Sequence, residues 1–434
     1  MSTPNPAPPR LRLPERHQMQ IDERSLDQLL PPDHVARTVW AYVEGLDLSA
    51  FRARIKAVEG KAGQPTIDPR ILLSLWLLAT LEGVGSAREL DRLTGLHIAY
   101  EWLCGGVSVN YHTLSDFRSD NEALLSGLLT QSVATLMQQG LVELQEVAQD
   151  GLRVRASAGA KSFRRAATLQ ECLEKAEQQV EALRKQLDED DGAVSRRQQA
   201  ARERAARERV ERIEEALRQQ QQLATRQEQV QKEKGAKRKK EPRASTTDPD
   251  ARVMKMPDGG FRPGYNAEFA TDTASGIVVG VDVVPVGSDH GQLLPMVEQI
   301  EARYQQTPER LLADGDFATL EDIQTLHEEH QTDVYAPVKN AAKEQAKGND
   351  PYRPKPKDPP GVGAWRIRMG TEEAKTIYQR RAQTAEWTNA RTRNMGLRQF
   401  LVRGLGKVRA VALLYALAHN LMQTLLLRAR AAVA

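Results

Sequence analysis

Residues 141–155 read LVELQEVAQDGLRVR, and residues 310–316 read RLLADGD. In both stretches leucine and valine lead up to an Asp-Gly pair, a pattern typical of a buried strand that presents an acid near its end. We therefore predict that one strand carries Asp150 and that a second strand ends at Asp314. Asp316 is the alternative second acid, although it follows a glycine rather than the apolar run.

The chain around these two strands predicts a regular order of further elements. Alternating and helical periodicity predict strands at 265–273, 277–286 and 333–338, and helices at 292–304, 320–330, 372–393 and 408–427. The stretch 340–370 is rich in Lys, Pro and Gly and is expected to be a mobile loop. The resulting order, β-β-β-α-β-α-β-α, is that of a ribonuclease H-like mixed sheet of the α/β class. In such a sheet the strands with Asp150 and Asp314 lie side by side.

A helical insertion over 166–243 interrupts this order. Apolar residues spaced by three and four predict two long helices, and Asp188–Gly192 separates them, so we expect an antiparallel coiled-coil hairpin. Its basic end contains Lys237, Arg238, Lys239 and Lys240. Dense positive charge gains from counterion release on phosphate, which favours nucleic acid as the partner of this end. A solvated coiled coil without a ligand is the alternative for the helices themselves.

The first third of the chain predicts an arm and a helical domain. Residues 1–30 are rich in proline and predict a flexible arm. Residues 31–140 predict an all-α domain of short helices joined by glycine turns, which is compatible with a helix-turn-helix unit or with a plain helical bundle. Arg88, Arg92, His112 and Arg118 are the candidates there for contacts with phosphate. Residues 141–434 would then form the catalytic domain.

Composition limits the class of protein. The chain has 434 residues and a net charge of +3, so two or three domains are expected and the clustering of charge matters more than its total. Two cysteines neither form a disulfide framework nor have zinc spacing, which favours a reducing cytoplasm. The opening residues lack a secretory signal, and the apolar runs 71–81 and 410–427 are interpreted as buried helices. We expect a soluble protein with no membrane partner.

A third acid, Glu386, lies on the predicted helix 372–393 together with Tyr378, Arg381 and Arg393. At about 100° per residue these four side chains lie on roughly one side of the helix. Three clustered carboxylates suit Mg²⁺, which prefers oxygen ligands. Two such ions can clamp the attacking and leaving oxygens of a displacement at phosphorus.

These motifs resemble the DDE transposases of bacterial insertion sequences. The resemblance rests on Gln149–Arg153, on Leu311–Gly315, on the Tyr-Arg-Glu-Arg set of the last catalytic helix, and on 68–118 as the preceding helical domain. It implies that Asp150, Asp314 and Glu386 are the catalytic acids and hold two Mg²⁺ ions, for which Mn²⁺ can substitute. It further implies that Arg381 and Arg393 contact DNA near the scissile phosphate.

The resemblance also implies partners and a reaction: cleavage and strand transfer at the two ends of an element in double-stranded DNA, by at least a homodimer on the nucleoid of a bacterial cytoplasm. Further basic residues on the last helices are expected to contact the DNA, together with Tyr378: Arg391, Arg398, Arg403, Lys407 and Arg409. A nuclease of the same fold and a non-catalytic regulator derived from such an element are the alternatives. Two features depart from the family pattern: the helical insertion, and one extra residue between Arg381 and Glu386.

Overall fold

The computed structural model describes residues 23–57, 65–189, 193–234 and 240–432. Most of the predicted arm, and the basic residues Lys237, Arg238 and Lys239, lie outside these ranges. The described part of the arm contains the short helix α1 (Leu26–Leu29), where Asp27 accepts hydrogen bonds from Arg37 and Trp102.

Within the described ranges, one mixed sheet holds six strands, and β1 (Glu146–Arg155) lies at its centre. β5 (Phe261–Asp272) runs antiparallel to β1, and β7 (Arg310–Leu312) and then β8 (Asp333–Tyr335) continue the sheet in parallel on the other side. β6 (Val278–Val284) and the short β4 (Arg252–Lys255) pair antiparallel with β5. The prediction that the strands of the two aspartates are neighbours is confirmed.

The register of β1 and β7 aligns the two acids. Ala148 lies opposite Leu312 in the parallel pair, and Asp150 and Asp314 each follow two residues later. Parallel strands rise by about 3.3 Å per residue on both sides of a pair. The two aspartates therefore emerge at the same level of the sheet, at the carboxyl end of β7.

The strands predicted at 265–273 and 277–286 are present as β5 and β6, which form an antiparallel β-hairpin. The long helix α17 (Leu405–Ala431) anchors this β-hairpin. Asn420 hydrogen-bonds to both the amide and the carbonyl of Val278, and His419 and Gln423 bond to the carbonyls of Gly276 and Ser275. The polar residues of this apolar helix thus satisfy the backbone of a buried turn. α17 is long and apolar enough to cross a membrane, but 78% of that stretch is buried within the fold.

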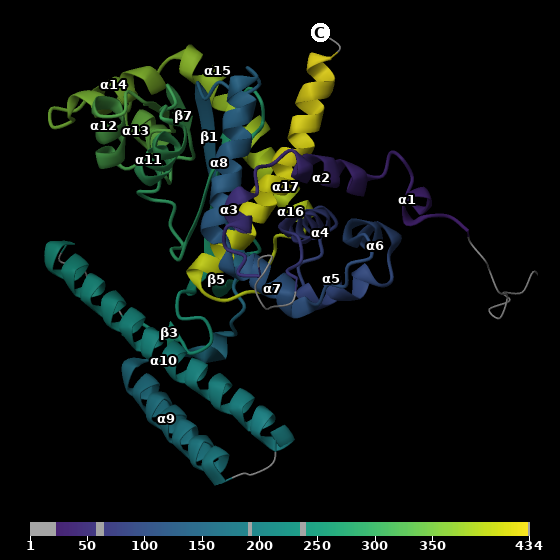
Figure 1. Ribbon diagram of the computed structural model, residues 1–434. Coiled ribbons are helices and arrows are strands. Elements are labelled where there is room, and N and C mark those ends of the chain that lie inside the picture. The colour runs from purple at the N-terminus through teal and green to yellow at the C-terminus, as the bar shows by residue number, and fades with distance from the viewer. Residues whose placement is uncertain (1–22, 58–64, 190–192, 235–239, 433–434) are drawn as a thin grey trace, which may run out of the picture.

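A layer of helices covers α17 on the side away from the sheet (Figure 1). Asp68 caps α4, which starts at Pro69, and α4, α7 and α8 all pack on α17. One hydrophobic core therefore runs continuously from the N-terminal helices into the sheet. The helices of this layer are α2 (Val35–Glu44), α3 (Ser49–Arg52), α4 (Pro69–Leu81), α5 (Ala87–Thr94), α6 (Ile98–Cys104), α7 (Tyr111–Asp120) and α8 (Glu122–Gln138).

The helical insertion is a hairpin of α9 (Ala166–Glu189) and α10 (Ala193–Lys234), as predicted. It projects from the rest of the molecule, and α10 continues well past the start of α9 (Figure 1). Leu169, Ala216 and Ala244 form a small separate core at its base. There the two-residue strands β2 (Phe163–Arg164) and β3 (Ala244–Ser245) pair with each other.

The expected mobile loop at 340–370 is wrong. This stretch contains α13 (Ala341–Ala346) and α14 (Pro360–Met369), which follow α11 (Leu293–Tyr304) and α12 (Leu320–Glu328) on one side of the molecule. Trp365 is buried and donates to the carbonyl of Ala336, and Arg366 pairs with Asp358 at 2.6 Å. The composition is loop-like, but one anchored tryptophan and one buried ion pair hold the segment in place.

The helix predicted at 372–393 is present but not uniform. It consists of α15 (Glu372–Arg381), a π-helical turn over Ala382–Glu386, and α16 (Trp387–Asn394). A π-turn accommodates one residue more than an α-helical turn and is often found at functional sites.

Candidate active site

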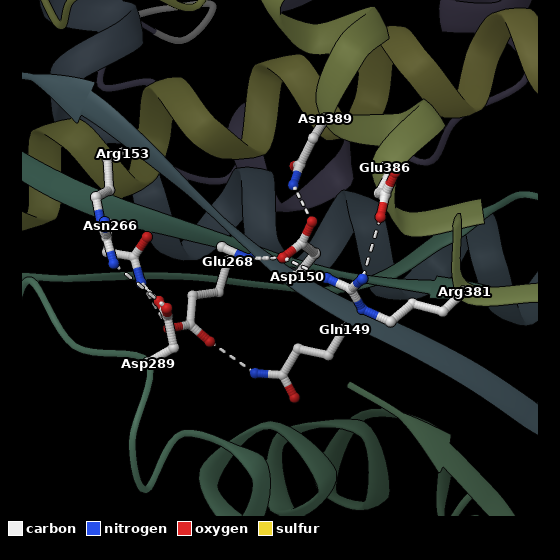
Figure 2. Close-up of polar contacts among 10 residues, drawn as sticks. Gln149, Asp150, Arg153, Asn266, Glu268, Asp289, Arg381, Glu386 and Asn389 are labelled. Carbon is white, nitrogen blue, oxygen red and sulfur yellow. Dashed lines mark hydrogen bonds and ion pairs between the residues drawn. The ribbon is translucent and has the colours of Figure 1, made fainter. Parts of the chain in front are cut away.

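Asp150 lies on the central strand with its carboxylate held from three directions (Figure 2). Its Oδ1 accepts from the backbone amide of Gly151 at 3.0 Å and lies 3.1 Å from Nη2 of Arg381. Its Oδ2 accepts from Nδ2 of Asn389 at 3.0 Å. Burial raises the pKa of Asp150 and Arg381 opposes that rise. The carboxylate is therefore fixed in orientation and largely withdrawn from solvent.

Arg381 is the centre of the acidic cluster. Besides the contact with Asp150, its Nη1 donates to Oε1 of Glu386 at 3.2 Å. Burial alone would lower the pKa of this guanidinium, but its interactions with Asp150, Asp314 and Glu386, together with Tyr378, raise that pKa above its ordinary value. Asp150 and Glu386 thus contact one buried cation directly, and Asp314 follows β7 at the level of Asp150 and also raises the pKa of that cation.

The π-turn explains how Glu386 reaches Arg381. The two residues are five positions apart, one more than the commonest spacing of the motif, and in a regular α-helix they would be offset by about 140°. The wider π-turn spans Ala382–Glu386, between the two side chains, and leaves them in contact. Glu386 remains more than half exposed, which makes it the most accessible of the carboxylates bound to Arg381.

Asp314 and Asp316 lie close enough to a further acid, Asp289, to act on it electrostatically. Asp314 and Asp316 are both exposed. Burial is the main cause of the raised pKa of Asp289, and the charges of Asp316 and Asp314 raise that pKa further. Asp314 also acts on Arg381 and on Tyr378, whose pKa is raised mainly by burial. Asp314 is thus electrostatically coupled to both Arg381 and Asp289.

A buried polar network lies next to Asp150 and joins side chains of β1 and β5 to Asp289. Glu268 is fully buried on β5 opposite Gly151 and accepts from Gln149 at 2.6 Å and from Asn266 at 3.0 Å. Burial raises its pKa to about 8. Asn266 also donates to Asp289 at 2.6 Å, so a single amide links the strand pair to the Asp289 loop.

Gly151 is enclosed by this network. A Cβ at this position would lie 2.8 Å from Oδ1 of Asn266 and 2.8 Å from Oδ1 of Asp289. Any side chain would push these oxygens away, so the glycine after Asp150 is required by close packing.

Sequence reasoning missed three supporting residues and interpreted one differently. Asn389 lies three residues after Glu386, and this helical spacing could have indicated it. Asn266 and Glu268 alternate on an apolar strand, which places two polar side chains on one face and could have indicated a buried network. Asp289 stands just before the helix predicted at 292–304, a position typical of a turn residue. Its carbonyl does accept from the amide of Gln292, but its carboxylate also joins the network.

The acids fit Mg²⁺ by donor type, since each offers carboxylate oxygen. Asp150 and Glu386 each contact the guanidinium of Arg381, so two of the acids are paired with a cation rather than with each other. Consistent with that arrangement, no group of three or more His, Cys, Asp or Glu residues in the described ranges has the geometry of a metal site.

The basic residues predicted to contact DNA fall in two places. Arg393 and Arg398 line a pocket beside β1, whereas Arg403 and Lys407 line a different pocket that also contains Glu208, Glu211, Glu215 and Asp250. The second pocket is therefore balanced in charge. Lys240, at the hairpin end, is exposed.

Three arginines that were expected to contact DNA instead interact with other residues of the protein. Arg118 is buried, donates to the carbonyl of Gly85 and stacks on Trp76, and burial lowers its pKa to about 10, so its expected contact with phosphate is wrong. Arg409 pairs with Asp282 at 2.9 Å, and Arg391 lies over the ring of Trp387.

Two family models match the chain. Residues 24–120 match a transposase domain (DUF772), and residues 241–421 match the transposase DDE domain. Neither a curated protein nor a solved structure gives a match.

The second matched segment contains Asp314 and Glu386 and begins after the hairpin, so Asp150 lies outside it. Strand pairing nevertheless inserts β1 between β5 and β7 of that segment. The two matches together span well over half of the chain, one on each side of β1 and the hairpin. The chain therefore belongs to the DDE-type transposases of insertion sequences.

Proposed function

We propose that this transposase cuts DNA strands at the ends of an insertion sequence and joins them to a target, with Asp150, Asp314 and Glu386 as its catalytic acids. The observation that carries the proposal is that Asp150 and Glu386 both contact Arg381, while Asp314 stands level with Asp150 on the neighbouring strand. They come from β1, from the end of β7 and from the π-turn, which are distant in sequence. Such convergence favours a shared chemical task over three separate surface roles.

The sheet supports a ribonuclease H-like fold for the catalytic part. The strands stand in the order β6-β5-β1-β7-β8, the first three antiparallel and the last three parallel. In chain order, with the hairpin and the short β4 set aside, this is 3-2-1-4-5. We infer that residues 141–434 form one such domain, with the hairpin inserted between its first and second core strands.

Asp150, Asp314 and Glu386 would hold two Mg²⁺ ions, with Mn²⁺ as a substitute. When bound, the ions supply Lewis-acid chemistry at phosphorus. The rest of the site orients and balances charge: Asn389 and the amide of Gly151 fix the Asp150 carboxylate. Arg381 offsets the repulsion among the acids.

The reaction proceeds without a covalent protein intermediate. Water attacks the phosphorus at the element's end and the bond to the 3′-oxygen breaks, leaving a 5′-phosphate and a free 3′-hydroxyl. That hydroxyl then attacks a target phosphodiester, forming one P–O bond as another breaks. Both steps are in-line displacements at the same cluster of carboxylates. Two ends have to be handled together, so a homodimer on DNA is the expected active form.

The N-terminal helices and the hairpin are proposed as auxiliary DNA contacts. Arg88, Arg92 and His112 are exposed on α5 and α7, and Lys240 is exposed next to Glu241, which accepts from the amide of Ala166 at the base of the hairpin. Because the N-terminal helices share one core with the catalytic sheet, their contacts would be rigidly placed relative to the acids.

The proposal is tested with a labelled duplex carrying the element's own ends. Wild-type protein in Mg²⁺ is expected to nick the duplex, and Asp150→Ala is expected to bind it without cutting. Binding by the wild type without cutting in Mg²⁺ or Mn²⁺ would instead identify a non-catalytic regulator. Cutting that never leads to joined products would identify a nuclease.

A further inference from the structure

An open pocket of about 530 Å³ lies beside β1, and its charge is strongly one-sided. Its ionisable lining consists of five arginines and one acid: Arg153, Arg155, Arg262, Arg393, Arg398 and Asp258. The acid is engaged by Arg262 at 2.5 Å. Arg153 is engaged more loosely, 3.5 Å from Asp289. The remaining three arginines form no ion pair or side-chain hydrogen bond with any described residue.

Backbone hydrogen bonds hold two of the unpaired arginines together. The amide of Arg155 donates to the carbonyl of Arg398 at 3.2 Å, and the amide of Phe400 donates to the carbonyl of Arg155 at 2.8 Å. The segment after α16 thus pairs in parallel with the end of β1. Both side chains line the same pocket, so this backbone pairing brings two exposed positive charges to one site, which favours an anionic ligand there.

The pocket is connected to the acidic cluster at two points. Arg153 follows Asp150 by three residues on β1 and contacts Asp289, which packs against Gly151. Arg393 follows Glu386 by seven residues along α16, which corresponds to about 10 Å of helix.

We propose that this arginine pocket binds the phosphate backbone of the DNA strand that enters the acidic cluster, close to the scissile phosphate. The inference rests on the proposed function for the identity of the strand. It adds Arg153, Arg155 and Arg262, from two strands of the sheet, to the basic residues of the last helices. Arginine suits this role because its planar donors match the geometry of phosphate oxygens.

The pocket next to Lys407 offers a comparison within the same molecule. It is similar in size, about 600 Å³, but four acids offset its four basic residues. A polyanion gains little there, because its repulsion from the carboxylates offsets its attraction to the bases. The arginine pocket is therefore the better phosphate site, although both contain residues predicted from the sequence to bind DNA.

The test measures binding of a labelled duplex of random sequence, without divalent metal, over a range of salt concentrations. Arg155→Gln and Arg398→Gln are each expected to weaken binding equally for all sequences and to reduce the slope of log K against log salt by about one. Arg155→Lys keeps the charge and is expected to keep the slope.

Arg310→Gln is the matched control. Arg310 lies on β7 and pairs with Glu146, at the end of β1 that is far from the arginine pocket. The substitution removes one positive charge there, and Arg380 still pairs with Glu146. The proposal would be overturned if both pocket variants kept the wild-type salt slope. It would also be overturned if Arg310→Gln reduced that slope as much as the pocket variants do. Failure of the wild type to cut DNA, with the pocket variants still binding more weakly, would overturn the catalytic proposal but not the phosphate pocket.

Discussion

Nη2 of Arg381 lies 3.1 Å from Oδ1 of Asp150, so the first acid of the cluster is paired with an arginine from the end of α15. Asp150 has only 20% of its side chain exposed and Arg381 only 10%. Arg381 also contacts Glu386, so the pair couples the central strand to the π-turn.

Replacing Arg381 with glutamine leaves Asp150 without its cation. We expect the free energy of unfolding, measured by urea denaturation in EDTA, to fall by about 1–3 kcal/mol. Added Mg²⁺ should recover part of this loss. Arg393→Gln removes an exposed arginine from the same helical run and should change stability by no more than about 0.5 kcal/mol. Equal stability of the two variants would contradict a structural role for the ion pair.

The π-turn provides a length variant. Deleting the exposed Gln383 removes one residue between Arg381 and Glu386 and should convert the π-turn into a regular α-helical turn. We expect the deletion variant to retain strand cleavage within about tenfold. Deleting the exposed Ala390 instead shifts Arg393 by about 100° relative to Glu386 and should abolish cleavage. Loss of activity in both deletions, with folding intact by circular dichroism, would refute the compensating role of the π-turn.

Gly151→Ala tests the close packing behind Asp150. The added methyl group would meet oxygens of Asn266 and Asp289 at 2.8 Å, so we expect a loss of about 1–3 kcal/mol in stability and a strong loss of cleavage. Gly127→Ala is the control, because its Cβ meets nothing within 4 Å in the middle of α8. That change should stabilise the protein by about 0.5–1 kcal/mol. Thermal melts that rank the two variants the other way would show that the network tolerates a side chain.

Glu268 should make stability depend on pH. Its folded pKa of about 8 lies above the ordinary value of 4.5, so the folded state keeps a proton that the unfolded chain releases. The stabilisation is complete below about pH 4.5 and is lost as pH rises towards 8, with a slope of at most about 1.4 kcal/mol per pH unit.

Glu268→Gln should remove this component of the pH dependence, measured as the difference in unfolding free energy from the wild type between pH 5 and 8. The same substitution at the exposed Glu298 should leave the wild-type slope unchanged. A Glu268→Gln curve parallel to the wild type would mean that the carboxyl is ionised throughout this range.

A second prediction of pH dependence concerns His419. Burial lowers its pKa to about 4, and the carbonyl of Gly276 opposes that shift. In the unfolded chain this histidine binds a proton below about pH 6.5, whereas in the folded chain it stays neutral down to about pH 4. Stability should therefore fall as pH drops from about 6.5 to 4. His419→Gln should reduce this acid destabilisation in melts recorded across that range, and an unchanged acid limb would exclude His419 as its source.

The strands, the hairpin, and the positions of Asp150 on β1 and Asp314 after β7 were predictable because their signals are local. Apolar runs before Asp150 and Asp314, and the tyrosine, arginine and glutamate of one helix, can be read from spacing alone. The pairing of β1 with β7 followed from the order of elements once the hairpin was set aside.

The supporting residues depend on contacts distant in sequence. Asn389 reaches Asp150 across 239 positions, and Gln149 reaches Glu268 across 119. Trp365 holds a segment whose composition predicted a loop. The π-turn was also hidden, because one extra residue in a helix leaves no compositional trace; the irregular spacing of Arg381 and Glu386 was its only signal.

The most direct test of the central claim is joining of a pre-cut element end to a target plasmid in Mg²⁺ by four variants compared side by side. Asp150→Asn, Asp314→Asn and Glu386→Gln should each bind the end as the wild type does and lose joining by about a thousandfold or more, equivalent to several kcal/mol of transition-state stabilisation. Asp316→Asn should retain joining within about tenfold. Loss of joining in Asp316→Asn with full activity in Asp314→Asn, or normal joining in any of the first three variants, would contradict the assignment of the catalytic acids.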